Sequence, residues 1–332
     1  MRVFITGGTG VIGRRIVAHL KARGDQAVVL SRNPEATRNR AELRGAQVVA
    51  GDPSASDDWA GHLNGCDGVI NLAGHNIFAN RWNGEIKRKI RDSRVYGTQH
   101  LVAAIRKASK PPTVLVHSSA IGYYGSQGDE ELTESSPPGS DFMAKVCREW
   151  EDAAHPAEAL GVRVASVRTG IVLAQGDGAL GVMTPVFRWL PGGAAPVGSG
   201  GSATPATGRQ WMSWIHLDDI ARLFVFALDR PEATGAINGT APHPERNADF
   251  SRVLAKVVHR PFVPFGPPDF LMRLMLGEVA QVVAEGQRVL PARAQALGFT
   301  YRFPTLREAL QDLFAKTPAP TTPNPVPAGA GH

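Results

Sequence analysis

The sequence contains few cysteines and no long apolar segment. Cys66 and Cys147 are its only cysteines, and their separation forms no metal or redox motif. A membrane helix needs roughly 18 consecutive apolar residues, whereas residues 223–228 are among the longest apolar runs here. The N-terminus runs into a glycine-rich turn and has no small-residue cleavage site of a secretory signal. We therefore expect a soluble, cytoplasmic protein without membrane contact, whose cysteines are small apolar core groups.

The excess of positive charge is also small. Lysine and arginine total 36 against 30 aspartates and glutamates, which gives a formal net charge of +6. Such an excess permits phosphate binding, but no nucleic-acid motif or interleaved basic–aromatic surface accompanies it. Hydrophobic residues make up 43% of the chain, enough for a buried core, and the length corresponds to about two domains. We expect no nucleic-acid partner and no metal site.

The first half of the chain alternates β-like and helical segments. Strands separated by helices of ten or more residues indicate parallel pairing with crossover helices on both faces. The expected fold is an α/β, doubly wound parallel sheet. Strands are expected at residues 2–6, 26–31, 47–50, 67–72, 113–118 and 162–168, and helices from the turn to about 23 and at 34–44, 83–108 and 141–160.

The alternation of strands and helices becomes less regular after about residue 170. We therefore expect a nucleotide-binding domain at 1–170 and a smaller C-terminal α/β substrate domain at 171–315. The chain is expected to cross back to the first domain near 211–240. Residues 192–208 are rich in Gly, Pro, Ser and Thr and predict an exposed loop. Residues 316–332 are mostly Pro, Ala, Thr and Gly and predict a disordered tail.

A glycine-rich turn joins the first strand to the first helix. Its sequence, TGGTGVIG, places glycines at 7, 10 and 13. Gly7 permits a tight turn, Gly10 allows the backbone to approach a pyrophosphate, and Gly13 allows the helix to pack closely on the sheet. The helix N-terminus then offers free N–H groups to the phosphates. This pattern predicts a Rossmann dinucleotide site; a bare structural turn is the alternative. The predicted contacts are Gly7, Gly8, Thr9, Gly10, Val11, Ile12 and Gly13.

The end of the second strand favours NADP over NAD. An acidic residue there would bind the ribose 2′-hydroxyl and repel a 2′-phosphate, but the chain has Ser31 and Arg32. A guanidinium binds phosphate in a bidentate manner, although Arg32 could equally be a solvated surface residue. Asp52 follows the third strand and either accepts a hydrogen bond from the adenine amino group or caps the turn at Pro53.

Several motifs together resemble the extended short-chain dehydrogenase/reductase (SDR) superfamily, within the NAD-dependent epimerase/dehydratase family. More narrowly, the chain resembles an atypical branch described as nucleoside-diphosphate-sugar epimerases, which has its own C-terminal domain. The resemblance covers residues 1–315, with an apparent insertion at 199–208. It rests on residues 6–13, 71–74 (NLAG), 81–82 (RW), 93–94 (SR), 118–125 (SSAIGYYG), 141–151 (DFMAKVCREWE), 168–170 (RTG), 211–219 (WMSWIHLDD), 286–291 (GQRVLP) and 298–304.

The resemblance implies an Asn, Ser, Tyr and Lys set for proton transfer, of which this chain keeps little. Lys145 matches the lysine that holds the ribose and lowers the pKa of the tyrosine. Asp141 stands four residues earlier, where tyrosine is expected, and the serine position falls on Ala120, next to Ser119. The asparagine position falls on Arg94. Three of the four positions therefore differ.

Other side chains could replace the missing groups. Tyr123 and Tyr124 follow the fifth strand at the carboxyl edge of the sheet, and either one donates a proton or packs against cofactor or core. Asp141 either caps its helix or acts as an acid or base. The resemblance also implies cofactor contacts from Leu72, Ala73, Gly74, Arg94, Ser118, Lys145 and Arg168.

Arg81, Trp82, Lys87 and Arg94 form a basic cluster around the start of the long helix. This cluster is either a solvated helix face or the mouth of the cofactor cleft, where it would bind an anionic substrate group. The sequence thus predicts an NADP(H)-binding epimerase or oxidoreductase acting on a small polar substrate that is anionic or nucleotide-linked. The alternative is an NADP(H)-binding regulator whose altered positions recognise a partner. A homodimer and a monomer are both compatible with the sequence.

Overall fold

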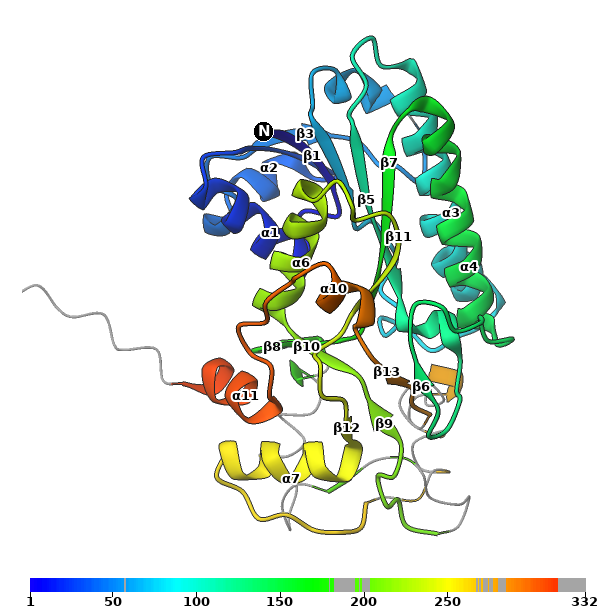
Figure 1. Cartoon of the computed structure of the whole chain (residues 1–332), viewed down its shortest axis with the longest axis vertical. Helices are drawn as coiled ribbons and strands as arrows, with labels where there is room; N and C mark the ends of the chain where they lie inside the picture. The colour runs from blue at the N-terminus through cyan, green and yellow to red at the C-terminus, as the bar shows by residue number, and fades with distance from the viewer. Residues whose placement is uncertain are drawn as a thin grey trace, which may run out of the picture.

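Seven parallel strands form the central sheet of the computed structural model, in the order β11-β7-β5-β4-β1-β2-β3 (Figure 1). The structure describes residues 1–56, 58–178, 180–181, 195–196, 198, 204–266, 268, 270, 274, 277–279 and 285–315. The sheet strands are β1 (Arg2–Thr6), β2 (Gln26–Ser31), β3 (Gln47–Ala50), β4 (Gly68–Asn71), β5 (Val114–Ala120), β7 (Arg163–Thr169) and β11 (Gly235–Gly239). The predicted doubly wound α/β sheet is confirmed.

Helices cover both faces of this sheet because alternate strand residues point to opposite sides. Val3 and Ile5 of β1 pack under α1 (Val11–Ala22) and α6 (Leu217–Asp229), whereas Phe4 packs on the opposite side. That opposite side is covered by α3 (Gly84–Lys107) and α4 (Phe142–Ala154), which lie to the right of the sheet in Figure 1. Short elements α2 (Pro34–Arg38), η1 (Ala41–Leu43) and η2 (Asp58–Leu63) complete this part.

Two of the expected helices are shorter than the sequence pattern predicts. The segment expected at 34–44 forms α2 and then the separate turn η1. The segment expected at 141–160 forms α4 and then η4 (His155–Leu160). Pro156 causes this second change, since it has no backbone N–H for an α-helical hydrogen bond.

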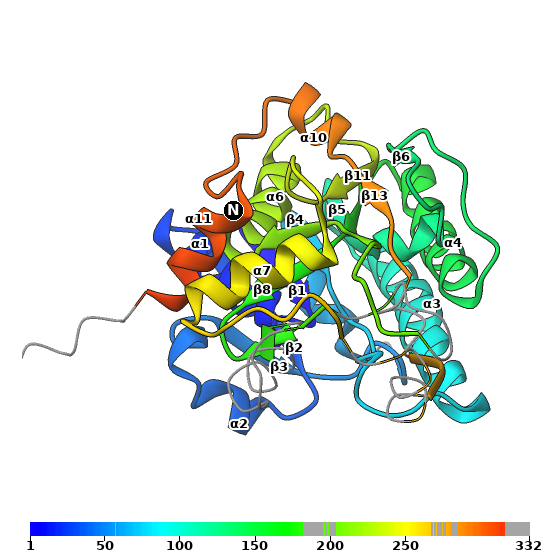
Figure 2. The ribbon, with the colours of Figure 1, turned by 90° about the horizontal axis from the view of Figure 1, so that it is seen from below.

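Beyond the carboxyl ends of the strands lies a second core, which we call the C-terminal lobe (Figures 1 and 2). Helices α7 (Asn247–Val257) and α11 (Leu306–Phe314) pack there on two of three two-stranded pairs. The pairs are β8 (Ile171–Ala174) with β10 (Trp214–His216), β9 (Trp211–Met212) with β12 (Glu245–Arg246), and β6 (Glu131–Leu132) with β13 (Arg288–Val289). The third pair, β6 with β13, packs with Ile121 and Tyr124 in a separate small cluster. Three short elements, η3 (Ile121–Tyr124), α10 (Ala292–Ala296) and η5 (Gly277–Val279), complete the chain.

The chain passes between the two parts more than once. After β10 it returns to the main sheet, where α6 covers one face and β11 pairs with β7. The carboxyl edge of the sheet therefore faces the C-terminal lobe. The loop predicted at 192–208 lies mostly, and the tail predicted at 316–332 wholly, outside the described residues. Among the helices that the structure describes, none is long and apolar enough to cross a membrane.

Candidate cofactor and catalytic site

The glycine-rich turn has the backbone geometry that its spacing predicts. Gly7 has a φ of +66°, and its carbonyl oxygen accepts a hydrogen bond of 3.0 Å from the N–H of Gly10. A Cβ on Gly13 would lie 2.6 Å from that oxygen, so only glycine lets α1 pack this closely. A Cβ on Gly10 would make one tight contact, 3.3 Å from the same oxygen, and would meet no other atom of the described residues within 4 Å. The space in front of Gly10 is therefore open.

The N-terminus of α1 presents unsatisfied N–H groups beside that opening. Gly10 is the N-cap, no side chain caps the helix, and its first turn contains no acidic residue. The first N–H groups of a helix have no partner within the helix and carry its positive dipole end. The carbonyl of Thr9 accepts hydrogen bonds from Arg14 and Arg40, at 2.9 and 3.2 Å. Arg14 also forms ion pairs with Glu42 and Asp177, at 3.6 and 3.8 Å. The turn therefore offers N–H donors to an anion, with the guanidinium of Arg40 nearby.

Ser31 and Arg32, at the end of β2, have different surroundings. Ser31 is buried, shares a hydrogen bond of 2.7 Å with Thr37, and accepts one from the N–H of Asn33. Arg32 is exposed, and its side chain makes no hydrogen bond or ion pair within the described ranges. Ser31 thus shapes the turn, whereas Arg32 can reach a ligand.

Asp52 caps its own turn. Its carboxylate accepts hydrogen bonds from the N–H and the hydroxyl of Ser54, at 2.9 and 2.6 Å. This geometry corresponds to the capping alternative. The adenine role of Asp52 stays a prediction.

A buried polar network fixes the carboxyl ends of β1 and β4. Thr6 donates to Asn71 at 2.5 Å, and Asn71 contacts Thr98 and His117 at 3.0 and 3.1 Å. Trp150 of α4 donates to Thr98 at 3.1 Å. Burial lowers the pKa of His117 to about 3, so its imidazole is neutral at pH 7. The network joins both helices α3 and α4 to the strands that carry the turn.

An ion pair between Glu151 and Arg168 lies at the centre of a second buried network. Two guanidinium nitrogens of Arg168 donate to the two carboxylate oxygens of Glu151, each at 2.9 Å, and Ser119 donates to Glu151 at 2.6 Å. Arg168 also donates to the hydroxyl of Tyr124 at 2.9 Å, and this hydroxyl donates to Asn238 at 2.7 Å. The network joins β5, α4, β7 and β11.

This network changes the interpretation of three predicted site residues. All three nitrogen groups of Arg168 are bonded to protein, and the residue is 4% exposed, so it cannot bind the cofactor directly as predicted. Ser119 is committed to Glu151. Tyr124 is fully buried, and burial raises its pKa to about 12, as in the packing alternative. Asn238 and Glu151 were not predicted, because nothing local in the sequence connects them to this network.

Tyr123 differs from its neighbour Tyr124. It is half-buried, the guanidinium carbon of Arg168 lies 3.4 Å from its ring centroid, and its hydroxyl has no hydrogen bond in the part of the chain that the structure describes. The phenol of Tyr123 therefore remains the candidate proton donor. Ser118 is largely buried, and its hydroxyl donates to the carbonyl of Ser119 at 3.5 Å.

Helix α4 does not present Lys145 to the site. Lys145 is exposed, and its side chain makes no hydrogen bond or ion pair among the described residues. Cys147 lies two residues further, which is about 200° around the helix, and is buried on the inner face. Cβ of Met143 and Sγ of Cys147 lie 3.5 and 3.8 Å from the position of a Cβ on Gly122, just after β5. The predicted contact of Lys145 with ribose is therefore corrected.

Glu151 determines which face of α4 points into the protein, because it pairs with the buried Arg168. Cys147 lies four residues earlier, on the same side of the helix. Met143 and Cys147 have the same four-residue spacing as Asp141 and Lys145, so spacing alone could not decide between them. Asp141 caps the helix, since its carboxylate accepts a hydrogen bond of 2.8 Å from the N–H of Ala144. Its acid–base role stays a prediction.

The basic cluster at the start of α3 is divided between two surfaces. Arg81 donates to the carbonyl of Leu274, and Lys87 forms an ion pair with Glu278, so both contact the C-terminal lobe. Trp82 packs edge-on against Phe142 of α4, with ring centroids 5.4 Å apart. Arg94 instead lies beside Gly74, which follows β4 with Leu72 and Ala73; Ala73 donates to Thr6 at 3.3 Å.

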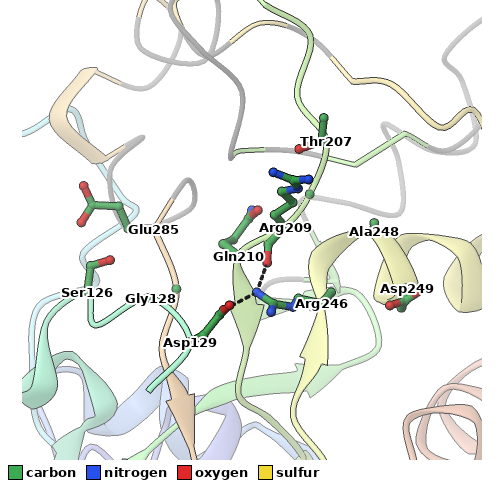
Figure 3. A pocket seen from close by; sticks show the side chains of 12 residues that line it. Ser126, Gly128, Asp129, Thr207, Arg209, Gln210, Arg246, Ala248, Asp249 and Glu285 are labelled. Carbon is green, nitrogen blue, oxygen red and sulfur yellow. Dashed lines mark hydrogen bonds and ion pairs between the residues drawn. The ribbon is translucent and has the colours of Figure 1, made fainter. Parts of the chain in front are cut away.

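A polar cavity of about 690 Å³ opens between the segment after η3 and the C-terminal lobe (Figure 3). Asp129 on one side pairs with Arg246 on the other at 2.7 Å and accepts a hydrogen bond from Trp211 at 2.9 Å. The side chain of Arg209 also lines the cavity and has no bonded partner among the described residues. Sequence reasoning missed this cavity because its residues come from four separate segments of the chain.

Both cysteines are expected to be unreactive in the folded protein. Burial raises the pKa of the Cys147 thiol to about 12 and also raises that of Cys66. Because the thiolate is the reactive form, a chromogenic disulfide reagent at pH 8 should react with neither cysteine in native protein and with both in urea. Rapid labelling of one thiol in the native protein would contradict this burial.

Comparison with known proteins places these features in a family. The model of the NAD dependent epimerase/dehydratase family matches residues 3–238, and that of a domain of unknown function, DUF1731, matches residues 267–313. The chain is 42% identical over 316 residues to the Epimerase family protein SDR39U1 homolog, chloroplastic, of Arabidopsis thaliana, covering 94% of this chain and 86% of the relative. It is 33% identical over 317 residues to the Epimerase family protein YfhF of Bacillus subtilis, covering 95% and 98%.

Solved structures show the same architecture. The crystal structure of human epimerase family protein SDR39U1 with NADPH matches with a TM-score of 0.82 and 34% identity, covering 96% of this chain and 100% of that one. The UDP-glucose 4-epimerase of Thermus thermophilus, in complex with NAD, matches with a TM-score of 0.73, covering 95% and 99%. Its identity of 21% supports the fold alone.

Proposed function

The chain belongs to the NAD dependent epimerase/dehydratase family, and we propose that it binds NADP(H) and uses it to transform a small polar substrate. The reaction class is that of an oxidoreductase or an epimerase, both of which move a hydride to or from nicotinamide. The observation that carries the proposal is the open turn at Gly10, which faces the uncapped N-terminus of α1.

The residues at this edge fit a dinucleotide. The turn and the first N–H groups of α1 would hold the pyrophosphate, since unsatisfied N–H groups and the helix dipole favour anions. Arg32 would bind the 2′-phosphate, and the NADPH in the human SDR39U1 structure supports this choice of cofactor. When bound, the cofactor supplies the hydride donor or acceptor. The chain's own residues bind it, orient it and exclude water.

Substrate binding is proposed for the cavity in Figure 3. It begins directly after η3, at the end of β5, where α/β sheets bind ligands. Its lining contains the carboxylates of Asp129, Asp249 and Glu285 as well as two guanidiniums, which favours a polar substrate. Asp129 already pairs with Arg246 and Asp249 with Arg252, so the unpaired guanidinium of Arg209 is the group that would receive an anionic part, as in a nucleotide-linked sugar. Tyr123, which lies in η3 just before the segment that lines the cavity, would move the proton at the reacting oxygen.

Replacing Arg32 by glutamine should weaken NADPH binding by about 10- to 100-fold, the range of a lost hydrogen bond to a charged group. NADH binding should not change, because NADH lacks the 2′-phosphate. Fluorescence titration of both nucleotides measures the two dissociation constants. Arg106→Gln, on the far end of α3, is the control and should change neither constant. Equal losses for NADPH and NADH would contradict the assignment of Arg32.

The proposal as a whole is tested by titrating the wild-type protein with NADPH. A dissociation constant above about 1 mM would overturn it. Mass spectrometry of ligands that copurify with the protein would identify the substrate. Oxidation or reduction of the nicotinamide with one substrate of a sugar-nucleotide and carbonyl panel would establish turnover.

A second candidate function is regulation without turnover. It is favoured by Met143 and Cys147, which occupy the inner face of α4, because neither a thioether nor a thiol of raised pKa transfers protons as a tyrosine–lysine pair does. Under this alternative, NADPH binds but no panel member changes nicotinamide absorbance. Loss of turnover in Tyr123→Phe, with unchanged NADPH affinity, would instead support the enzyme.

A further inference from the structure

Arg94 is a partly buried cation without a counter-charge. Only its Nη1 atom is bonded, and it donates to the carbonyls of His75 and Ile90 at 3.0 Å each. No carboxylate pairs with the guanidinium in the part of the chain that the structure describes. Burial lowers its pKa, which reflects the cost of keeping the charge out of water. A charge in such a place normally has a partner.

Two other arginines show how this fold otherwise satisfies a buried guanidinium. Arg168 has the carboxylate of Glu151. Arg163 donates to the carbonyls of Ala227, Ala233 and Leu228, and so uses both terminal nitrogens. The Nε and Nη2 atoms of Arg94 have no comparable partner among the described residues.

The Nε and Nη2 atoms of Arg94 lie beside Gly74, just beyond the carboxyl end of β4. A Cβ on Gly74 would lie 3.1 Å from the guanidinium carbon, 3.2 Å from Nη2 and 3.4 Å from Nε. A larger residue at this position would therefore crowd the guanidinium, whereas glycine does not. Gly74 is exposed and follows β4, which pairs with β1, the strand that ends in the glycine-rich turn. Trp150 stacks behind the guanidinium at 5.0 Å.

The neighbouring position on α4 carries no charge. Cys147 interacts electrostatically with Arg94, and its thiol stays neutral at pH 7 because burial raises its pKa. The fixed positive charge at this edge therefore comes from α3, where Arg94 lies, and not from the inner face of α4.

We propose that Arg94 is an anion-binding residue whose Nε and Nη2 atoms receive two oxygens of a ligand phosphate or carboxylate. A guanidinium fork matches either group in a bidentate manner. The anion is the cofactor pyrophosphate or an anionic group of the substrate, and the inference about its source rests on the proposed function. Arg94 thereby selects ligands that bring their own negative charge to this position.

The test compares Arg94→Gln and Arg94→Lys with the wild-type protein. The control is Arg91→Gln, one turn earlier on α3, where the arginine pairs with the exposed Glu149. Calorimetry measures the affinities for NADPH and for 2′,5′-ADP, which lacks the nicotinamide half and the complete pyrophosphate. Thermal unfolding with inorganic phosphate, against chloride of equal ionic strength, measures anion binding with and without NADPH.

If the cofactor supplies the anion, Arg94→Gln weakens NADPH binding at least about tenfold and leaves 2′,5′-ADP binding unchanged. If the substrate supplies it, NADPH binding is unchanged, and the stabilisation of NADPH-loaded protein by phosphate is lost. Arg94→Lys keeps the charge but not the fork, so it should give an intermediate effect.

The inference is overturned if Arg94→Gln and Arg94→Lys match the wild-type protein in all three measurements, or if Arg91→Gln causes an equal loss. A wild-type protein that does not bind NADPH would overturn the proposed function instead. In that case the phosphate measurement on the free protein still decides the role of Arg94. Where Arg94→Gln does not fold, the Arg94→Lys comparison carries the test.

Discussion

Replacing Glu151 by alanine should lower the free energy of unfolding by about 3–5 kcal/mol, as expected when one partner of a buried ion pair is removed. Arg168 would keep its charge in the interior, and its remaining partner, the Tyr124 hydroxyl, cannot replace the two carboxylate oxygens. Ser119 would lose its acceptor as well. Urea unfolding monitored by tryptophan fluorescence measures the loss.

Glu149→Ala is the matched control for this substitution. Glu149 lies two residues earlier on α4 and pairs with Arg91 at 2.6 Å, but both side chains are more than a third exposed. Exposed pairs contribute at most about 1 kcal/mol. Equal losses in Glu151→Ala and Glu149→Ala would contradict the central position of Glu151 and, with it, the orientation of α4 derived above.

Replacing Gly10 by valine should abolish cofactor binding and leave the fold intact. The side chain would occupy the open space in front of the turn, where the proposed pyrophosphate binds, so NADPH affinity should fall at least about 100-fold, equivalent to about 2.7 kcal/mol. Gly10 has φ −73° and ψ 171°, which valine adopts freely. Loss of the glycine N-cap should cost about 1 kcal/mol of stability. Fluorescence titration and thermal unfolding measure the two effects separately.

Two further glycine variants serve as comparisons for Gly10→Val. Gly61→Ala is the control, because no atom of the described residues lies within 4 Å of its added Cβ, and it should leave NADPH affinity unchanged without lowering stability. Gly13→Val should instead destabilise the protein, since the added Cβ would lie 2.6 Å from the backbone of Gly7 and Gly8. Retention of NADPH binding in Gly10→Val would exclude the turn as the pyrophosphate site.

The glycine-rich turn could be predicted because its geometry is local. Gly7 adopts a positive φ, and a Cβ on Gly13 would meet backbone atoms of Gly7 and Gly8, only a few residues away. The alternation of strands and helices likewise follows from short-range hydrophobic periodicity. Strand order and the return of the chain to form α6 and β11 depend on contacts far apart in sequence, which periodicity does not encode.

The inner face of α4 shows the opposite case. A four-residue spacing places two side chains on one face of a helix, but it does not state which face meets the sheet. Lys145 was therefore assigned from spacing to a position that Cys147 occupies in the structure. The choice is made by Glu151, whose carboxylate pairs with the buried guanidinium of Arg168 on β7.

By itself the sequence determined the class of fold, the position of the glycine-rich turn and the candidate for the 2′-phosphate, Arg32. These depend on local backbone geometry and on which charge follows a strand. The tertiary structure alone decided that Arg168 and Tyr124 are buried supports, that Lys145 faces away from the site, and that Arg94 lacks a counter-charge. Burial and ion pairing between separate elements set these roles, because the free energy of a charge depends on the groups that the fold brings around it.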